Sequence, residues 1–185
     1  MPVAVSTIIS VGVRAGAKAV GSAVRRTAKN LFGKGSGVEL TRKEVFKLNK
    51  NLRIEDVLND IGDVVVKDVK DGIVKYEEDI EGVSFAPLSP YTKAYKAKKG
   101  YKYPNKPLYA KGKMKNVYIK KRATKTKKEV VIATNERDRP GVGAKHQEGK
   151  EVKQRKWFGI SKRTNKPIEV VANEHIKKAL RKWTF

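Results

Sequence analysis

Apolar residues recur every three or four positions between residues 54 and 69, with polar residues between them. This spacing places the apolar side chains on one face of an α-helix. They are Ile54, Val57, Leu58, Ile61, Val65 and Val69. The intervening acidic residues are expected on the solvated side, and they are Glu55, Asp56, Asp60, Asp63 and Asp68. Asp71 and Gly72 break the pattern, so we expect the helix to end there and to pack on a sheet.

Two further segments have the features of helices. Thr41 and Glu44 have the spacing of a capping box, which predicts a short helix from Thr41 to about Leu48. A C-terminal helix is expected to begin near Asn165, with Pro167 in its first turn. The apolar positions of this last helix are Ile168, Val171, Ala172, Ile176, Ala179, Leu180 and Trp183.

Apolar and polar residues alternate at 116–120 and again at 129–134, which predicts two strands. Lys125–Lys128 lies between them, so the strands are expected to form an antiparallel pair with a basic tip. Residues 138–143 contain a proline and two glycines and are expected to form a loop. Together these elements predict an α+β fold in which a small antiparallel sheet packs with two or three helices.

Proline and tyrosine mark the segment before the strands. Six of the seven tyrosines fall between residues 91 and 118. A long regular element is not expected there, because of Pro87, Pro90, Pro104 and Pro107. We therefore expect a lysine- and tyrosine-rich loop region at about residues 86–128, inside a domain that spans residues 39–185.

The charge is strongly positive and unevenly distributed. Lys and Arg number 43 against 19 Asp and Glu, a net charge of +24. Residues 83–128 hold fifteen basic residues and no acidic one, whereas residues 39–82 hold twelve acidic and eight basic residues. A charge of this size repels itself, so the partner is expected to be polyanionic or acidic: nucleic acid, an acidic protein surface or anionic lipid.

Residues 1–38 form an extended basic arm, with six basic residues and no acidic one, and residues 33–37 are typical of a flexible linker. The apolar run at its start ends where Arg14 and Lys18 appear, whereas a membrane span needs about 20 apolar residues. The positive charge also follows this run instead of preceding it. We therefore expect neither a secretory signal nor a membrane anchor.

Residues suited to catalysis or metal binding are scarce. The chain has no cysteine, which excludes disulfides and thiolate chemistry. His146 and His175 are its only histidines, and neither has a companion at the spacing of a metal motif. His146, at the end of the expected loop, is predicted to make a structural hydrogen bond. We expect no enzymatic activity, no metal and no cofactor.

Lysines interleaved with tyrosines are typical of nucleic-acid-binding surfaces, because phosphates attract cations and bases stack on flat rings. The alternative is that the tyrosines fill a protein interface while the lysines face water. Arg122 is the only arginine in residues 83–128, which favours general electrostatic contact over sequence recognition. The candidate DNA- or partner-contacting residues are Lys93, Lys96, Lys98, Lys99, Lys102, Lys120, Lys121, Arg122, Lys125, Lys127, Lys128, Arg25 and Arg26.

Six short segments between residues 85 and 161 form an ordered set of motifs. They are Phe85-Ala-Pro-Leu-Ser-Pro-Tyr-Thr92, Lys106-Pro-Leu108, Ala110-Lys-Gly112-Lys-Met114, Val130–Thr134, Gly143-Ala144-Lys-His146-Gln147-Glu-Gly149 and Arg155-Lys-Trp157-Phe158-Gly159-Ile-Ser161. In content and order this set resembles the phage virion morphogenesis family, the tail-completion or neck proteins of tailed bacteriophages. Phe85 stands where the family has tryptophan, Lys111 where it has threonine, and Gly143 where it has tyrosine.

The motif residues make physical sense as scaffold. Pro87 and Pro90 are expected to stiffen a loop, His146 and Gln147 to tie a loop through hydrogen bonds, and four glycines, among them Gly143, to allow turns at strand ends. The residues to which the resemblance assigns a structural role are Phe85, Pro87, Leu88, Ser89, Thr92, Pro107, Leu108, Gly112, Met114, His146, Gln147, Gly149, Arg155, Phe158, Gly159 and Ser161.

The resemblance implies a subunit that forms a ring of six or twelve copies at the head–tail junction of the virion, after assembly in the host cytoplasm. Its partners would be copies of itself, the portal, neck and tail proteins, and packaged DNA through non-specific electrostatic contact, with no membrane involved. The alternative is a basic nucleic-acid-binding protein of ribosomal or nucleoid type, which the charge and the tyrosine–lysine segment favour.

Overall fold

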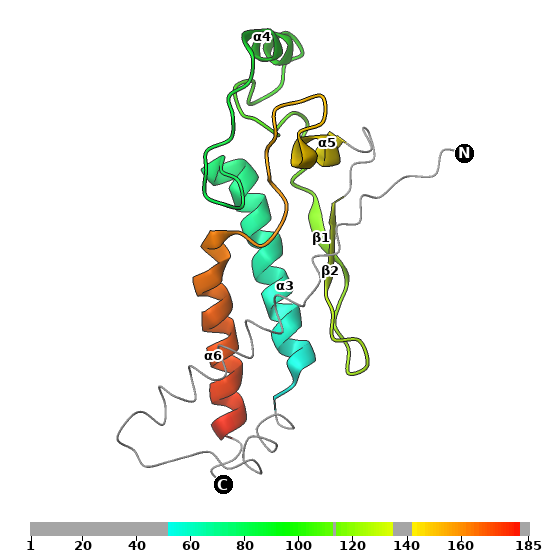
Figure 1. The fold of residues 1–185 in the computed structure, drawn as a ribbon, viewed down its shortest axis with the longest axis vertical. Coiled ribbons are helices and arrows are strands. Elements are labelled where there is room, and N and C mark those ends of the chain that lie inside the picture. The colour runs from blue at the N-terminus through cyan, green and yellow to red at the C-terminus, as the bar shows by residue number, and fades with distance from the viewer. Residues whose placement is uncertain (1–51, 113, 135–141, 182–185) are drawn as a thin grey trace, which may run out of the picture. The chain divides into compact units, whose positions relative to one another are not determined.

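The computed structural model describes residues 52–112, 114–134 and 142–181 (Figure 1). Its elements follow in the order α3 (Ile54–Asp71), a π-helical turn (Gly72–Tyr76), α4 (Pro90–Lys98), β1 (Val117–Lys121), β2 (Val131–Thr134), α5 (Val142–Glu148), a 3₁₀ turn (Lys162–Thr164) and α6 (Asn165–Arg181). Helices together with a two-stranded antiparallel sheet confirm the predicted α+β class. The basic arm at 1–38 and the helix predicted at 41–48 lie outside the described residues.

The described residues form two compact units. The first unit contains residues 62–120 and 131–164, and so holds α4, nearly all of the strand pair and α5. The second unit contains residues 52–61, 121–130 and 165–181, which include the first turns of α3 and the whole of α6. Among the described helices, none combines the length and the apolar content that a membrane crossing requires.

Helix α3 forms where the apolar spacing predicted it. Its α-helical part ends at Asp71, at the predicted break, and the chain continues into the π-helical turn. Burying this stripe removes apolar surface from water, which is the main favourable contribution to folding. Its fully buried members are Val57, Leu58, Ile61, Val65 and Val69.

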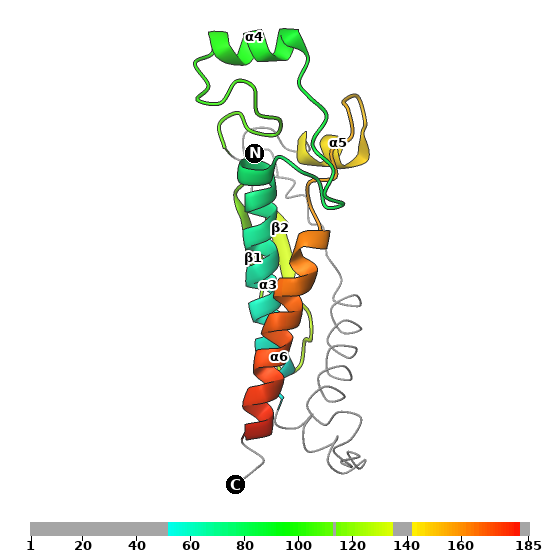
Figure 2. The same ribbon diagram turned by 90° about the vertical axis from the view of Figure 1, so that its left-hand side faces the viewer.

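Helix α6 also agrees with its prediction. It begins at Asn165, and Pro167 lies in the first turn, where the missing N–H removes no intrahelical hydrogen bond. Within the second unit α6 lies beside the first turns of α3 (Figures 1 and 2), and His175 Nε2 lies 2.7 Å from Asp60 Oδ2. The buried side chains of α6 are Ile168, Ala172, Ile176 and Ala179.

The strand pair β1–β2 confirms the predicted hairpin. Val117, Ala133 and Thr134 are its most deeply buried residues. Beyond β1, the side-chain amide of Asn59 on α3 exchanges two hydrogen bonds with the backbone of Ala123, at 3.2 Å and 2.8 Å. This amide therefore ties the base of the basic tip to the first turns of α3.

Helix α4 contradicts the expectation of loop structure throughout residues 86–128. The prolines predict no long regular element here, yet Pro90 occupies the first turn of a nine-residue helix, where its fixed φ suits a helix. Ser89 caps the helix, because its hydroxyl oxygen accepts a hydrogen bond from the Thr92 N–H at 3.2 Å. Pro90, one of the four prolines, thus belongs to a helix start.

Helix α5 corrects a second loop prediction. Val142 and Gly143 were expected in a loop and His146 at its end, but all three lie within α5. The Gly143 carbonyl oxygen accepts a hydrogen bond at 3.0 Å from the indole N–H of Trp157, fourteen residues later. Gly143 is therefore a helical residue and not a turn at a strand end. Gly149 does adopt a left-handed conformation, with φ of +75°, but it follows a helix.

The solvated side predicted for the acidic residues of α3 is wrong for two of them. Glu55 is only 7% exposed, and its carboxylate pairs with Lys128 at 3.0 Å. The Asp68 carboxylate accepts a hydrogen bond from the Ser161 hydroxyl at 2.6 Å and pairs with Arg163 at 3.1 Å. These partners are 73 and 95 residues away in the chain, so helical periodicity could not indicate them.

Candidate partner-binding surface

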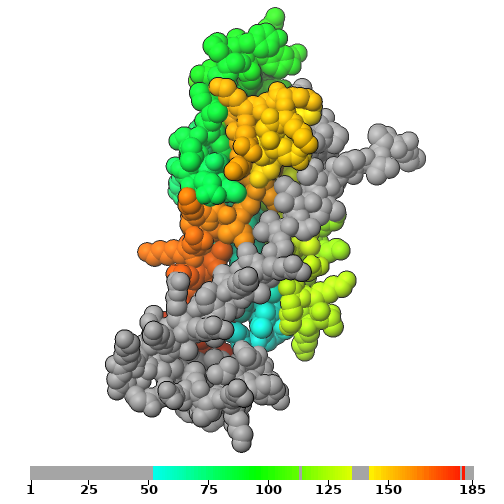
Figure 3. Space-filling view, viewed as in Figure 1, coloured from blue at the N-terminus to red at the C-terminus, as the bar shows by residue number. Residues whose placement is uncertain are grey.

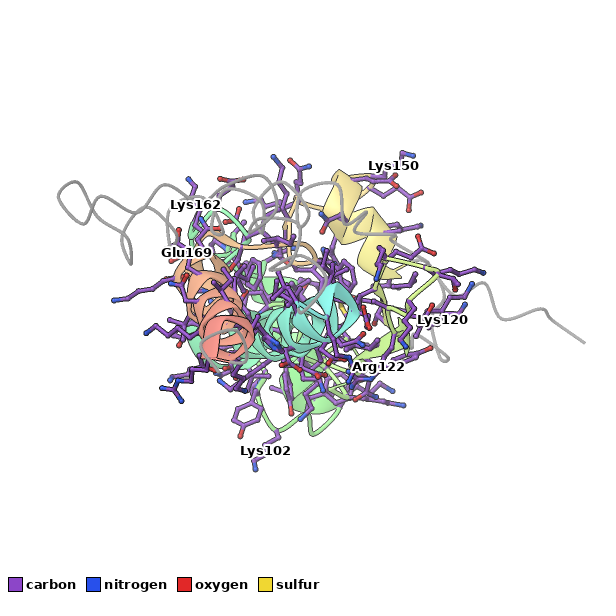
Figure 4. The ribbon with its side chains drawn as sticks, turned by 90° about the horizontal axis from the view of Figure 1, so that it is seen from below. Lys102, Lys120, Arg122, Lys150, Lys162 and Glu169 are labelled. Atoms are coloured by element: carbon purple, nitrogen blue, oxygen red, sulfur yellow. The ribbon has the colours of Figure 1, made fainter. Side chains whose placement is uncertain are left out.

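Helix α4 presents tyrosine and lysine side chains to solvent. Tyr91 is 80% exposed and Tyr95 is 40% exposed. They are four residues apart and therefore lie on the same side of the helix. Lys98 and Lys99 follow one turn later on that same side. The atoms of α4 and of the loop that follows it (green) lie at the surface in Figure 3, and Lys102 extends outward in Figure 4.

The other side of α4 is held by a buried lysine. Lys96 is 6% exposed, and its ammonium donates a hydrogen bond to the carbonyl oxygen of Lys106 at 2.6 Å. Lys106 in turn donates to the carbonyl oxygen of Val74 at 2.8 Å and pairs with Glu77 at 3.0 Å. Burial lowers the pKa of Lys96. The prediction that Lys96 contacts a partner is therefore wrong, because this lysine anchors α4 and is not free to bind a partner.

Several tyrosines of this segment hold lysine ammonium groups against their rings. The Lys99 nitrogen lies 5.9 Å from the centre of the Tyr95 ring, and the Lys102 nitrogen lies 5.4 Å from that of Tyr103. Lys106 is 5.5 Å from the Tyr103 ring, and Lys115 is 5.6 Å from the Tyr109 ring. These distances are within the range of cation–π attraction. The Tyr103 and Tyr109 rings also pack edge to face, with centroids 5.1 Å apart.

The four acidic side chains between residues 77 and 81 are engaged with other partners. Glu77 pairs with Lys106, Glu78 with Arg163, and Glu81 with Lys162, each at 3.0 Å. Asp79 accepts hydrogen bonds from the backbone N–H groups of residues 81 and 83, at 2.8 Å and 2.9 Å. In the part of the chain that the structure describes, no ion pair involves Lys93, Lys98, Lys99 or Lys102.

The basic residues of the hairpin differ in their availability. Lys120, Lys121, Lys125 and Lys127 are exposed, and Lys120 extends outward in Figure 4. Lys128 forms an ion pair with the buried Glu55 carboxylate. The backbone N–H of Glu55 and the Lys128 ammonium hold the pKa of that carboxyl at about 2. Arg122 is exposed as well, and Arg25 and Arg26 lie outside the described residues.

Three of the motif segments meet around Arg155. Arg155 is 5% exposed, and its guanidinium donates two hydrogen bonds to the Ala86 carbonyl oxygen, from Nε at 3.1 Å and from Nη2 at 2.7 Å. Nη1 donates to the Lys153 carbonyl oxygen and lies 3.2 Å from His146 Nδ1. A guanidinium only donates, so His146 Nδ1 accepts and the ring is neutral. Burial, and then the charge of Arg155, lower the pKa of His146.

Gln147 joins the same segments through its side-chain amide. Its Nε2 donates to the Phe158 carbonyl oxygen and its Oε1 accepts from the Phe158 N–H, both at 3.1 Å. The predicted role of His146 and Gln147 in tying a loop by hydrogen bonds is therefore confirmed. Phe158 and Trp157 are buried and pack edge to face at 5.3 Å.

The remaining motif residues differ in how deeply they are buried. Phe85, Pro107 and Leu108 are buried, whereas Leu88 and Met114 are half-buried and Pro87 is exposed. Gly112 has a left-handed φ of +76° and Gly159 a φ of +153°, conformations that favour glycine. Ser161 donates to Asp68, as described above, and the sequence interpretation missed its partners Asp68 and Arg163. No pattern of spacing links those two positions.

Among the described residues, no group of three or more histidines, aspartates or glutamates is placed to hold a metal ion. No protein-family model matches this chain, and the comparisons with curated proteins and with solved structures found no match. The side chains described above are therefore the basis for inferring function.

Proposed function

We propose that this protein is a structural virion subunit of a tailed bacteriophage, a ring-forming neck or tail-completion protein at the head–tail junction. One observation carries the proposal. The segments that resemble the phage family, although up to 69 residues apart, are joined by the hydrogen bonds of Arg155 to Ala86 and to His146. Residues that carry the resemblance thus belong to one hydrogen-bonded cluster.

The chemistry of these residues supports a scaffold role. Arg155 and Gln147 direct their hydrogen bonds at backbone atoms of neighbouring segments, and His146 uses Nδ1 to accept from Arg155. A general base or nucleophile would need a free, positioned atom next to a substrate site. The proposal therefore includes no enzymatic activity. The protein functions through its binding surfaces, among them the exposed face of α4.

In this role the protein assembles in the host cytoplasm and becomes part of the virion. Copies of the chain form a ring of six or twelve through one repeated heterologous interface. The portal, neck and tail proteins are the neighbours above and below that ring.

A phage that carries this gene provides the test. Deleting the gene should leave filled heads and separate tails that join once the intact gene is supplied on a plasmid, as seen by negative-stain electron microscopy. Cryo-electron microscopy of intact particles should then place the chain in a ring between portal and tail. Infectious particles of normal yield without the gene would refute the proposal. Absence of the protein from purified particles, together with co-purification with nucleic acid, would favour the nucleic-acid-binding alternative.

A further inference from the structure

Several lysines of α4 and of the loop after it have no acidic partner among the described residues. The chain has no acidic residue between positions 82 and 128. The carboxylates just before this stretch pair with other lysines: Glu77 with Lys106 and Glu81 with Lys162. Lys98, Lys99 and Lys102 consequently face solvent without an ion pair in the described part of the chain. Like charges on one surface repel, so an anionic partner would stabilise the arrangement.

Three tyrosines of this segment are poorly suited to stacking on nucleic-acid bases. A single-strand platform needs ring faces that are free to receive a base. Here the rings of Tyr95, Tyr103 and Tyr109 each already hold a lysine nitrogen at 5.4–5.9 Å. Their better-supported role is to position ammonium groups, because the attraction to a ring restricts an otherwise flexible lysine. The hydroxyl groups of tyrosines can also donate to phosphate oxygens.

An acidic protein fits the same face less well. Protein interfaces are enriched in tyrosine but depleted of lysine, and their centres exclude charge. On α4 the exposed Tyr91 and Tyr95 are continued by Lys98 and Lys99 on the same side. The helix of nine residues is about 13 Å long, and duplex DNA carries one charge per roughly 1.7 Å of its axis. A duplex can therefore supply a phosphate to each of these lysines.

We infer that α4 and the loop after it form a binding site for the phosphate backbone of double-stranded DNA, without sequence recognition. Lys98, Lys99 and Lys102 supply the charge, and Tyr95 and Tyr103 hold two of these ammonium groups in place. The cations of this face are all lysines. Recognition of DNA bases favours the forked guanidinium of arginine, so lysines fit contact with the DNA backbone better. This inference goes beyond the proposed function, and neither depends on the other.

The test is fluorescence anisotropy with a labelled 30-base-pair duplex and a 30-nucleotide single strand, over a series of salt concentrations with the full-length protein. The variant replaces Lys98, Lys99 and Lys102 by glutamine. Its matched control replaces Lys166, Lys177 and Lys178 of α6, which are also exposed, and so removes the same charge from another surface. Circular dichroism confirms that both variants are folded.

The slope of log affinity against log salt should fall in magnitude by about 2.7 for the α4 variant, at about 0.9 per phosphate contact. The control should retain most of the wild-type slope, and the duplex should bind at least as tightly as the single strand. An equal decrease of the slope in both variants would overturn the assignment of the site to α4, since it would show that DNA binding depends only on the net charge of the protein.

A Tyr91→Ala variant separates backbone contact from stacking. Its affinity for the single strand should change less than about threefold, whereas a stacked base would make the loss about fivefold to 150-fold. A large loss specific to the single strand would overturn the inference in favour of base stacking. Binding to poly-glutamate but not to the duplex would overturn it in favour of an acidic protein partner.

Discussion

Arg155 offers the most direct test of how the motif segments hold together. This residue is 5% exposed, and its guanidinium donates hydrogen bonds to the Ala86 carbonyl oxygen, the Lys153 carbonyl oxygen and His146 Nδ1. All of these acceptors are neutral. The change Arg155→Gln keeps a planar donor group but shortens the side chain and removes most of the donors. The acceptors farthest from the new amide are then left without partners.

The magnitude follows from those lost contacts. A buried acceptor without a partner costs about 1–3 kcal/mol. Two such acceptors, the part-buried Ala86 oxygen and His146 Nδ1, would cost at most about 2–6 kcal/mol together, because water reaches each of them in part. Glutamine also removes a buried charge, which is favourable and offsets part of that cost. We therefore expect Arg155→Gln to lower the free energy of unfolding by about 2–4 kcal/mol.

Urea denaturation followed by circular dichroism measures that loss. Lys156→Gln is the matched control, because the neighbouring Lys156 is exposed, and its replacement should change the free energy of unfolding by less than about 0.5 kcal/mol. NMR titration of His146 gives a second readout. Its pKa lies below the ordinary 6.5 because of burial and of the charge of Arg155, so it should rise when that charge is removed.

Two results together would refute this reasoning. One is a loss in Arg155→Gln no larger than in Lys156→Gln, and the other is an unchanged pKa of His146. That outcome would mean that the guanidinium does not hold the segments of Ala86 and His146 together.

Two further predictions concern the cap of α4 and the buried carboxylate of α3. Ser89→Ala should destabilise α4 by about 1 kcal/mol, seen as faster hydrogen exchange in residues 92–98, whereas Ser89→Asp should restore protection because aspartate also caps; equal exchange in all three proteins would contradict the cap. Glu55 has a pKa of about 2 against an ordinary 4.5, so its contribution to stability is present above pH 4.5 and is lost as the pH falls towards 2. In Glu55→Gln the urea midpoint should be lower than that of the wild type at pH 6, and the difference should shrink by pH 2; a constant difference would exclude this role.

Local patterns in the chain determined the long elements. The stripe from Val57 to Val69 specified α3, and the alternation on either side of the basic tip specified the hairpin β1–β2. The position of Pro167 marked the start of α6. Such signals lie within a few residues of one another, because helical and strand periodicities are properties of adjacent turns and pleats. They remain readable without knowledge of the fold.

Helix α4 shows how a local signal can be present and yet be misread. Ser89, Pro90 and Thr92 have the residue types of a capped helix start, but the count of prolines around them favoured a loop. The position of a proline relative to a cap decides its effect, since a first-turn proline removes no helical hydrogen bond. The information was in the chain, and closer attention to the cap could have found it.

Only the tertiary structure decided which charged residues are free. By composition, Lys96 and Lys98 are equivalent, yet Lys96 is buried against a carbonyl oxygen while Lys98 faces water. Glu55 and Asp68 lie on one helix with other acids, yet each meets a basic partner more than 70 residues away. Charge and spacing along the chain thus determine that the protein is basic and where its helices run. Which cations remain for a partner depends on contacts between distant segments, which exist only once the chain has folded.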